Sequence, residues 1–120
     1  HWKQPTVAPL LWNGADTPFR RGVPALAAGD QVAVWRSRLS AAQARALAGR
    51  PVLEVEDGFI RSAGLGADCV PPLSICVDEQ GAHFDPNQPS GLEIILQNSH
   101  FPSDLLARAQ QLRAAIVAGG

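Results

Sequence analysis

The segment EVEDGFIRSAGLG, residues 54–66, gathers the residue types from which an active site can be built. Two adjacent carboxylates, Glu56 and Asp57, end a strand-like run, and Gly58 and Arg61 follow closely. A partly desolvated carboxylate can act as a general acid or base, and an arginine fork binds carboxylate or phosphate groups. The segment is therefore either the wall of an active site or a strand-to-loop connection closed by a local ion pair.

The two adjacent acids are the candidate catalytic residues. Neighbouring side chains of a strand point to opposite faces, so one of Glu56 and Asp57 is expected to face the crevice beyond the carboxyl end of the strand. Open α/β sheets bind their ligands at that end. In the alternative interpretation, Asp57 caps the following turn through the backbone and Glu56 is solvated.

The glycine-rich backbone after Arg61 is a candidate for anion binding, because such backbone can turn its N–H groups toward an anion. The predicted substrate-binding residues are Gly58, Arg61, Ser62, Gly64 and Gly66. No Lys-Ser/Thr pair follows the glycines and no GxGxxG pattern occurs, so the loop is neither a P-loop nor a dinucleotide fingerprint. Alternatively, Arg61 only pairs with Glu56 or Asp57 and clips the loop.

Four further residues are candidates for the same crevice. Trp35 and Arg36 stand at the end of an earlier predicted strand, whose carboxyl end faces that crevice. Ser74 and Asp78 belong to a later strand-like run. At Asp78 the structural interpretation is favoured, because aspartates at turns usually accept hydrogen bonds from nearby backbone. His83 is interpreted as a packed or exposed strand residue.

The composition argues against several classes of function. A chain of 120 residues fits a single domain, and a net charge of -1 gives no electrostatic reason to expect nucleic acid as a partner. No apolar run approaches the ~18 residues that a membrane span needs. Cys69 and Cys76 fit no metal spacing and are interpreted as free thiols. The histidines are scattered, so no metal site is predicted.

The elements that position the candidate residues follow from local patterns. Residues 1–29, rich in Pro, Gly and Ala, are expected to form an irregular lead-in with at most one short element near residues 10–12, and residues 30–120 to form the α/β domain. Strand, helix and strand over residues 31–57 predict a βαβ unit with a right-handed crossover and a parallel pair. Ser40 and Gln43 form the capping box of its helix.

The second half of the chain predicts a β-hairpin and two helices. Alternating residues from Leu73 and a turn at residues 78–81 predict a hairpin whose second strand is residues 82–84. Ser90 and Glu93 predict the start of a short helix. A longer helix is expected from Ser103, with its apolar side chains on one face. The chain ends on this helix without a closing strand, which indicates part of a larger module.

EDGFIRSAGLG, followed by PPLSICVDEQGAHFDP and PSGLEIIL, resembles the KpsC/LipA-type capsule polysaccharide biosynthesis proteins. Beyond the first motif the matching positions are Pro72, Ser74, Asp78, Gly81, Asp85, Ser90, Leu92 and Glu93. The similarity covers roughly residues 31–117. The chain departs from the family where Ala82 and His83 replace the usual Ile and Tyr, and where Arg36 stands at a position that is commonly glycine.

The resemblance implies a Rossmann-like, three-layer part of a GT-B-like glycosyltransferase that retains configuration. The reaction would transfer Kdo, an acidic keto-sugar, from CMP-Kdo to a lipid-linked β-Kdo linker at the inner face of the bacterial inner membrane, in the cytoplasm. No cofactor and no metal are implied, because cationic side chains and helix N-termini can stabilise the departing CMP. Peripheral membrane association and contact with capsule assembly proteins are further expectations.

For the residues, the resemblance implies that Glu56 or Asp57 is the acid/base partner and that Arg61 and Ser62 hold a sugar carboxylate. The nucleophile and the CMP pocket are expected beyond residue 120, so the chain alone is expected to fold but not to turn over. Two alternatives stay open: a non-catalytic module that binds anionic glycan or nucleotide through Arg61 and the glycine loop, and a structural domain in which the acid–arginine cluster is only a clip.

Overall fold

The computed structural model describes residues 3–15, 17–62 and 68–119. Within these residues the chain forms a three-stranded sheet with the order β1-β2-β3. The strands are β1 (Val32–Trp35), β2 (Val52–Asp57) and β3 (Ile75–Asp78). β1 is parallel to β2, which confirms the predicted parallel pair, and β3 is antiparallel to β2. The central strand is therefore the one that carries the two candidate acids.

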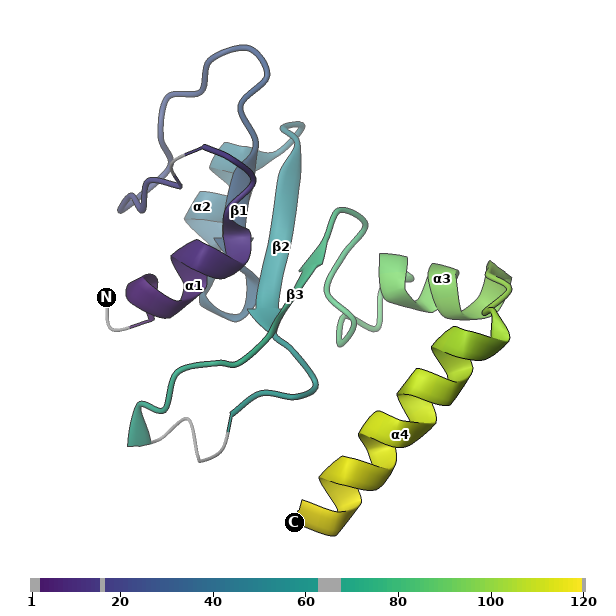
Figure 1. Cartoon of the computed structure of the whole chain (residues 1–120). Coiled ribbons are helices and arrows are strands. Elements are labelled where there is room, and N and C mark those ends of the chain that lie inside the picture. Colours follow the sequence, from purple (N-terminus) through teal and green to yellow (C-terminus); the bar gives the residue numbers. More distant parts are fainter. Residues whose placement is uncertain (1–2, 16, 63–67, 120) are drawn as a thin grey trace.

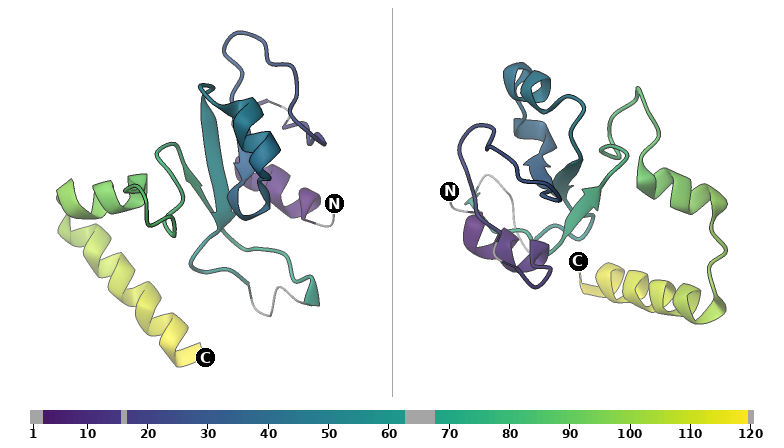
Figure 2. Two further views of the ribbon diagram at one scale, coloured as in Figure 1. Left: turned by 180° about the vertical axis from the view of Figure 1, so that it is seen from behind. Right: turned by 90° about the horizontal axis from the view of Figure 1, so that it is seen from above.

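Helices cover both faces of the sheet. α1 (Gln4–Leu11) lies on one face and α2 (Ala41–Leu47), in the connection from β1 to β2, lies on the other, as Figure 1 and the view from behind in Figure 2 show. Val7 of α1, Val55 of β2 and Leu47 of α2 are buried. The predicted three-layer α/β arrangement is thus confirmed around β1 and β2, and burial of these apolar side chains stabilises it.

The lead-in contains a short element, as expected, but this element is a helix over residues 4–11 and begins earlier than the expected position near residues 10–12. Pro5 lies in its first turn, where the missing N–H is no loss. A helix this short depends on tertiary packing, and α1 obtains it by burying Val7, which is 3% exposed. The described residues between α1 and β1 contain no helix or strand.

The predicted hairpin is wrong in its second strand. β3 forms, but its antiparallel partner is β2, and residues 82–84 turn away from the sheet. The reason lies in side-chain acceptors: the carboxylate of Asp78 accepts hydrogen bonds from the backbone N–H groups of Gln80 and Gly81, and Glu54 accepts one from Ala82 at 2.7 Å. These N–H groups donate to side-chain carboxylates and form no ladder.

Both predicted capping boxes are present. Ser40 and Gln43 close the start of α2, and Ser90 and Glu93 close the start of α3 (Gly91–Asn98). α4 (Ser103–Gly119) follows, and α3 and α4 project away from the sheet (Figure 1). Apart from the half-buried Leu92, their large apolar side chains remain exposed. Of the described helices, none has the length and apolarity that a membrane crossing requires.

At the end of β2, the backbone of Gly58 packs closely against the backbone of Ser74. Its N–H donates to the carbonyl oxygen of Ser74 at 2.9 Å, and a Cβ on Gly58 would lie 3.0 Å from the Ser74 carbonyl carbon. We therefore expect Gly58→Ala to lower the free energy of unfolding by about 1–3 kcal/mol through this overlap. Thermal unfolding measures the loss, with Gly119→Ala, which meets nothing within 4 Å, as the matched control. Equal midpoints for the two variants would contradict the close packing.

Candidate functional site

The two candidate acids point to opposite faces of β2, as strand geometry predicts. Asp57 reaches Lys3, at the start of α1, whereas Glu56 accepts a hydrogen bond from the backbone N–H of Ser37 on the other side. We call the side of the sheet covered by α1 the α1 face, and the side reached by Glu56 the cavity face. The predicted site is therefore divided between two environments.

On the α1 face, Asp57 is held between two cations. Lys3 Nζ lies 3.1 Å from its Oδ1, and Arg61 Nε lies 2.6 Å from its Oδ2. Lys3 Nζ also lies 4.2 Å from the centroid of the Trp35 ring. Burial alone would raise the pKa of Asp57, but the hydrogen bonds and charges of Arg61 and Lys3 outweigh it and lower that pKa. The ion pair between Asp57 and Arg61, one of the alternatives considered, is thus present.

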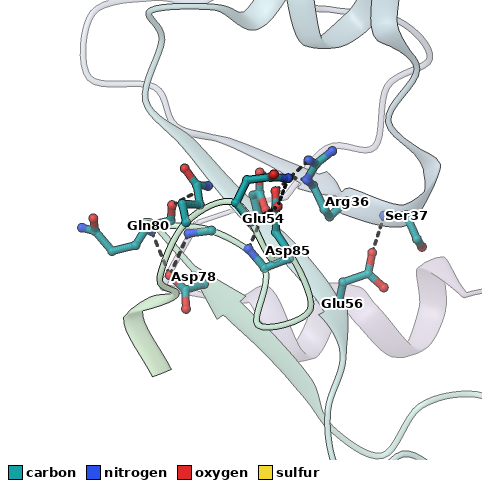
Figure 3. Close-up of polar contacts among 11 residues, drawn as sticks. Arg36, Ser37, Glu54, Glu56, Asp78, Gln80 and Asp85 are labelled. Carbon is teal, nitrogen blue, oxygen red and sulfur yellow. Dashed lines mark hydrogen bonds and ion pairs between the residues drawn. The ribbon is translucent and has the colours of Figure 1, made fainter. Parts of the chain in front are cut away.

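On the cavity face, Glu54 and Glu56 line an open cavity of about 390 Å³. Figure 3 shows the polar contacts of these two side chains. The strand register places Glu54 opposite Asp78 and Glu56 opposite Cys76, so these four side chains share one face. Other lining residues include His83, Leu92 and Ile95. The cavity thus combines carboxylates, an imidazole and apolar walls, the mixture typical of small-ligand sites.

Arg36 links the cavity face to the chain that follows β3. Its Nη2 lies 3.3 Å from Asp85 Oδ2, and its Nε lies 3.2 Å from Glu54 Oε1, an ion pair by distance that lacks the alignment of a hydrogen bond. Glu54 also accepts the Ala82 N–H (Figure 3). Sequence reasoning missed Glu54, although its spacing of two residues from Glu56 places both on one face of a strand.

Asp78 has a structural role that the sequence favoured. Its carboxylate accepts hydrogen bonds from the backbone N–H groups of Gln80, Gly81, Gly91 and Leu92, and the last two belong to the first turn of α3. Burial alone would raise the pKa of Asp78, but these four hydrogen bonds outweigh it, so the pKa lies below its usual value. Asp78 therefore anchors α3 to the end of β3.

Lowering the pH should reduce the folding stability of the wild type more than that of the Asp78→Asn variant. Because the pKa of Asp78 is lower in the folded state, its contribution is present above the unfolded pKa of ~3.9 and is lost as the pH falls through the folded value. At neutral pH we expect Asp78→Asn to cost about 1–2 kcal/mol. Thermal unfolding between about pH 6 and pH 2 tests this, with Asp104→Asn on exposed α4 as the control. A difference that stays constant with pH would contradict it.

The remaining predicted site residues are dispersed. Gly58 and Ser74 close the connection between β2 and β3, Trp35 lies on the α1 face, and Ser62 is half-buried next to Arg61. Gly64 and Gly66 lie outside the described residues. Cys69 and Cys76 are free thiols. Over residues 3–15, 17–62 and 68–119, no group of three or more His, Cys, Asp or Glu could hold a metal ion.

The sequence is similar to proteins of capsule polysaccharide modification and lipopolysaccharide processing. The capsule polysaccharide modification protein LipA of Neisseria meningitidis serogroup B is 48% identical over 63 residues, which are 52% of this chain and 9% of LipA. The lipopolysaccharide-processing protein LpsZ of Rhizobium meliloti is 44% identical over 72 residues, 58% of this chain and 16% of LpsZ. The chain thus spans only a small part of these curated relatives.

A solved structure and a family profile agree with these matches. KpsC of Thermosulfurimonas dismutans, a beta Kdo 2,4 transferase, superposes with a TM-score of 0.52 at 36% identity, over 68% of this chain and 26% of that chain. The α/β fold predicted from the sequence is therefore that of a segment of a GT-B-like glycosyltransferase. The family profile described as capsule polysaccharide biosynthesis protein matches residues 26–118. This match covers most of the sequence, and the chain belongs to the capsule polysaccharide biosynthesis protein family.

Proposed function

We propose that this chain is the acceptor-side part of a retaining glycosyltransferase that transfers Kdo from CMP-Kdo to a lipid-linked β-Kdo glycan. Family membership and the similarity to a solved β-Kdo transferase support the reaction class. One observation supports the site within this chain: Glu56 lines a cavity on the face shared by β2 and β3, together with Glu54.

Glu56 is the better suited of the two acids for acid/base work. An acceptor hydroxyl must lose its proton as it attacks, and a carboxylate within hydrogen-bonding distance can accept that proton. Among the described residues, Glu56 has one hydrogen-bond partner, the Ser37 N–H. Asp57 is instead paired with Lys3 and Arg61, and its lowered pKa makes it a weaker base than an ordinary aspartate. We assign the acid/base role to Glu56 and a positioning role to Asp57.

Arg61 is proposed to hold a substrate carboxylate. The Arg61 Nε is paired with Asp57, but the Arg61 side chain is 43% exposed and so can present its terminal N–H groups to an anion.

Retention of configuration requires a second, nucleophilic carboxylate. We place this nucleophile and the CMP site in the part of the longer relatives that this chain does not span. Cationic groups there can stabilise departing CMP without a metal, and the lipid-linked acceptor places the reaction at the inner face of the inner membrane.

Product analysis tests the proposed reaction. The full-length protein that carries this chain is incubated with CMP-Kdo and a synthetic Kdo-terminated lipid acceptor, and the product is identified by mass spectrometry. We expect the acceptor to gain one Kdo residue with release of CMP, and CMP-sialic acid to give no product. Acceptor binding without any transfer would support the non-catalytic alternative. Turnover by residues 1–120 alone would contradict the placement of the donor site elsewhere.

A further inference from the structure

We propose that Lys3 is a positioning residue, which holds Asp57 so that the terminal N–H groups of Arg61 stay available for the carboxylate of an acidic sugar. This inference rests on the proposed function, in which Arg61 binds that carboxylate, and adds a residue at the start of α1 to the site. α1 lies outside residues 26–118, the part of the chain that matches the family profile. Lys3 thus extends the site to a segment that the profile does not cover.

The carboxylate of Asp57 is divided between two cations. Lys3 Nζ lies 3.1 Å from Oδ1 and 3.4 Å from Oδ2, and Arg61 Nε lies 2.6 Å from Oδ2. An arginine that meets a carboxylate alone commonly binds both of its oxygens in a bidentate pair. Because Lys3 occupies Oδ1, Arg61 contacts Asp57 through Nε. In the described part of the chain the Arg61 side chain makes this one hydrogen bond, so its terminal N–H groups are left for another anion.

Lys3 is itself held from a second side. Its Nζ lies 4.2 Å from the centroid of the Trp35 ring, a distance at which the ring attracts a cation. Trp35 ends β1 and pairs with Val55 of β2, so the ring is fixed by the sheet. The Lys3 side chain is 18% exposed. An ammonium held between a ring and a carboxylate keeps the geometry around Asp57 fixed before a ligand binds, which lowers the entropic cost of binding.

The charges of the three side chains favour an anionic ligand. Asp57 is ionised at neutral pH, so Lys3, Asp57 and Arg61 together carry a net positive charge. A pair of Asp57 and Arg61 without Lys3 would be neutral. The excess charge attracts a carboxylate, whereas a neutral sugar gains little from it. Lys3 is therefore expected to affect the binding of an acidic sugar more than that of its uncharged ester.

Removal of Lys3 should change the pairing of Arg61. In Lys3→Met, Oδ1 of Asp57 becomes accessible, and Arg61 can take both oxygens in a bidentate pair. This pairing occupies a terminal N–H group of Arg61 and leaves the cluster neutral. Methionine keeps an unbranched apolar stem beside Trp35, and partly exposed ion pairs contribute little to stability. The thermal midpoint should therefore stay near that of the wild type.

Binding measurements on the full-length protein that carries this chain test the role of Lys3. The probes are a Kdo disaccharide glycoside, its methyl ester, in which the carboxylates are neutral, and CMP. We expect Arg61→Met to raise the Kd of the acid at least about tenfold and Lys3→Met to raise it about 3–10-fold. The Kd of the ester should not change. Arg38→Met removes the same charge from an exposed arginine and should leave both Kd values unchanged.

Two further variants separate positioning from a direct contact. If Lys3 acts through Arg61, the double variant Lys3→Met/Arg61→Met should bind the acid no more weakly than Arg61→Met alone. Lys3→Arg keeps a cation beside Asp57 and should retain most of the preference for the acid over the ester.

Four results would overturn the role of Lys3. The first is an unchanged Kd of the acid in Lys3→Met when its thermal midpoint matches the wild type. The second is an equal loss for acid and ester, which would indicate a change in packing. The third is additive losses in the double variant, which would indicate that Lys3 acts independently of Arg61. The fourth is a larger loss for CMP than for the disaccharide, which would indicate a phosphate of the donor as the ligand.

Failure of the proposed function would give a different result. Absence of Kdo transfer by the wild type would refute the proposed reaction. The preference of the same protein for the acid over the ester, and its dependence on Lys3, would still report on the positioning of Arg61.

Discussion

Glu56→Gln is expected to lower kcat for Kdo transfer by about 10²–10⁴-fold, the usual contribution of a positioned general acid or base. Glutamine cannot take up the proton of the acceptor hydroxyl. Its side-chain oxygen can still accept the Ser37 N–H, so the contact between β2 and the chain that follows β1 is retained. The thermal midpoint should therefore stay near that of the wild type, and the loss should appear in kcat more than in acceptor Kd.

Asp57→Asn is the matched control, because it makes the same chemical change at the adjacent residue on the α1 face. It removes the charge that pairs with Lys3 and Arg61. Partly exposed pairs of this kind contribute about 0–1 kcal/mol each, so a modest loss of stability and a smaller loss of kcat are expected. A larger loss of kcat in Asp57→Asn than in Glu56→Gln would refute the assignment of the acid/base role.

Arg36→Met is expected to be among the most destabilising substitutions on the cavity face. It leaves Glu54, whose side chain is 19% exposed, without its cation. An uncompensated buried charge costs about 3–5 kcal/mol. Because the Arg36 side chain is itself 33% exposed, we expect about 1–3 kcal/mol, measured by urea unfolding. The neighbouring Arg38→Met should have little effect, because Arg38 is exposed.

A second substitution separates loss of charge balance from loss of packing. If the uncompensated carboxylate causes the instability, adding Glu54→Gln to Arg36→Met should recover part of the lost free energy. Glutamine keeps an oxygen for the Ala82 N–H, which Glu54 accepts in the wild type. Equal stability of Arg36→Met and Arg38→Met would show that Arg36 does not hold this face together.

The elements predicted correctly are those specified by neighbouring residues. The capping boxes Ser40/Gln43 and Ser90/Glu93 each join residues three apart, so the sequence alone identifies where both helices start. The β-branched run before α2 and the apolar periodicity of α4 are equally local signals. The opposite orientation of Glu56 and Asp57 also follows from strand geometry alone.

The features that sequence reasoning missed depend on residues far apart in the chain. Asp57 pairs with Lys3 across 54 positions, and Arg36 pairs with Asp85 across 49 positions. No local pattern encodes such contacts. The same holds for α1, whose proline-rich sequence forms a helix by packing Val7 on the sheet, and for β3, which pairs with β2 instead of residues 82–84. Tertiary packing decided these cases over local propensity.

The structure of the full-length protein with a bound Kdo-terminated acceptor would locate the reacting hydroxyl. If Glu56 is the acid/base group, that hydroxyl lies in the cavity within about 2.6–3.2 Å of the Glu56 carboxylate. An acceptor bound instead on the α1 face, with its hydroxyl against Asp57, would contradict the proposed site.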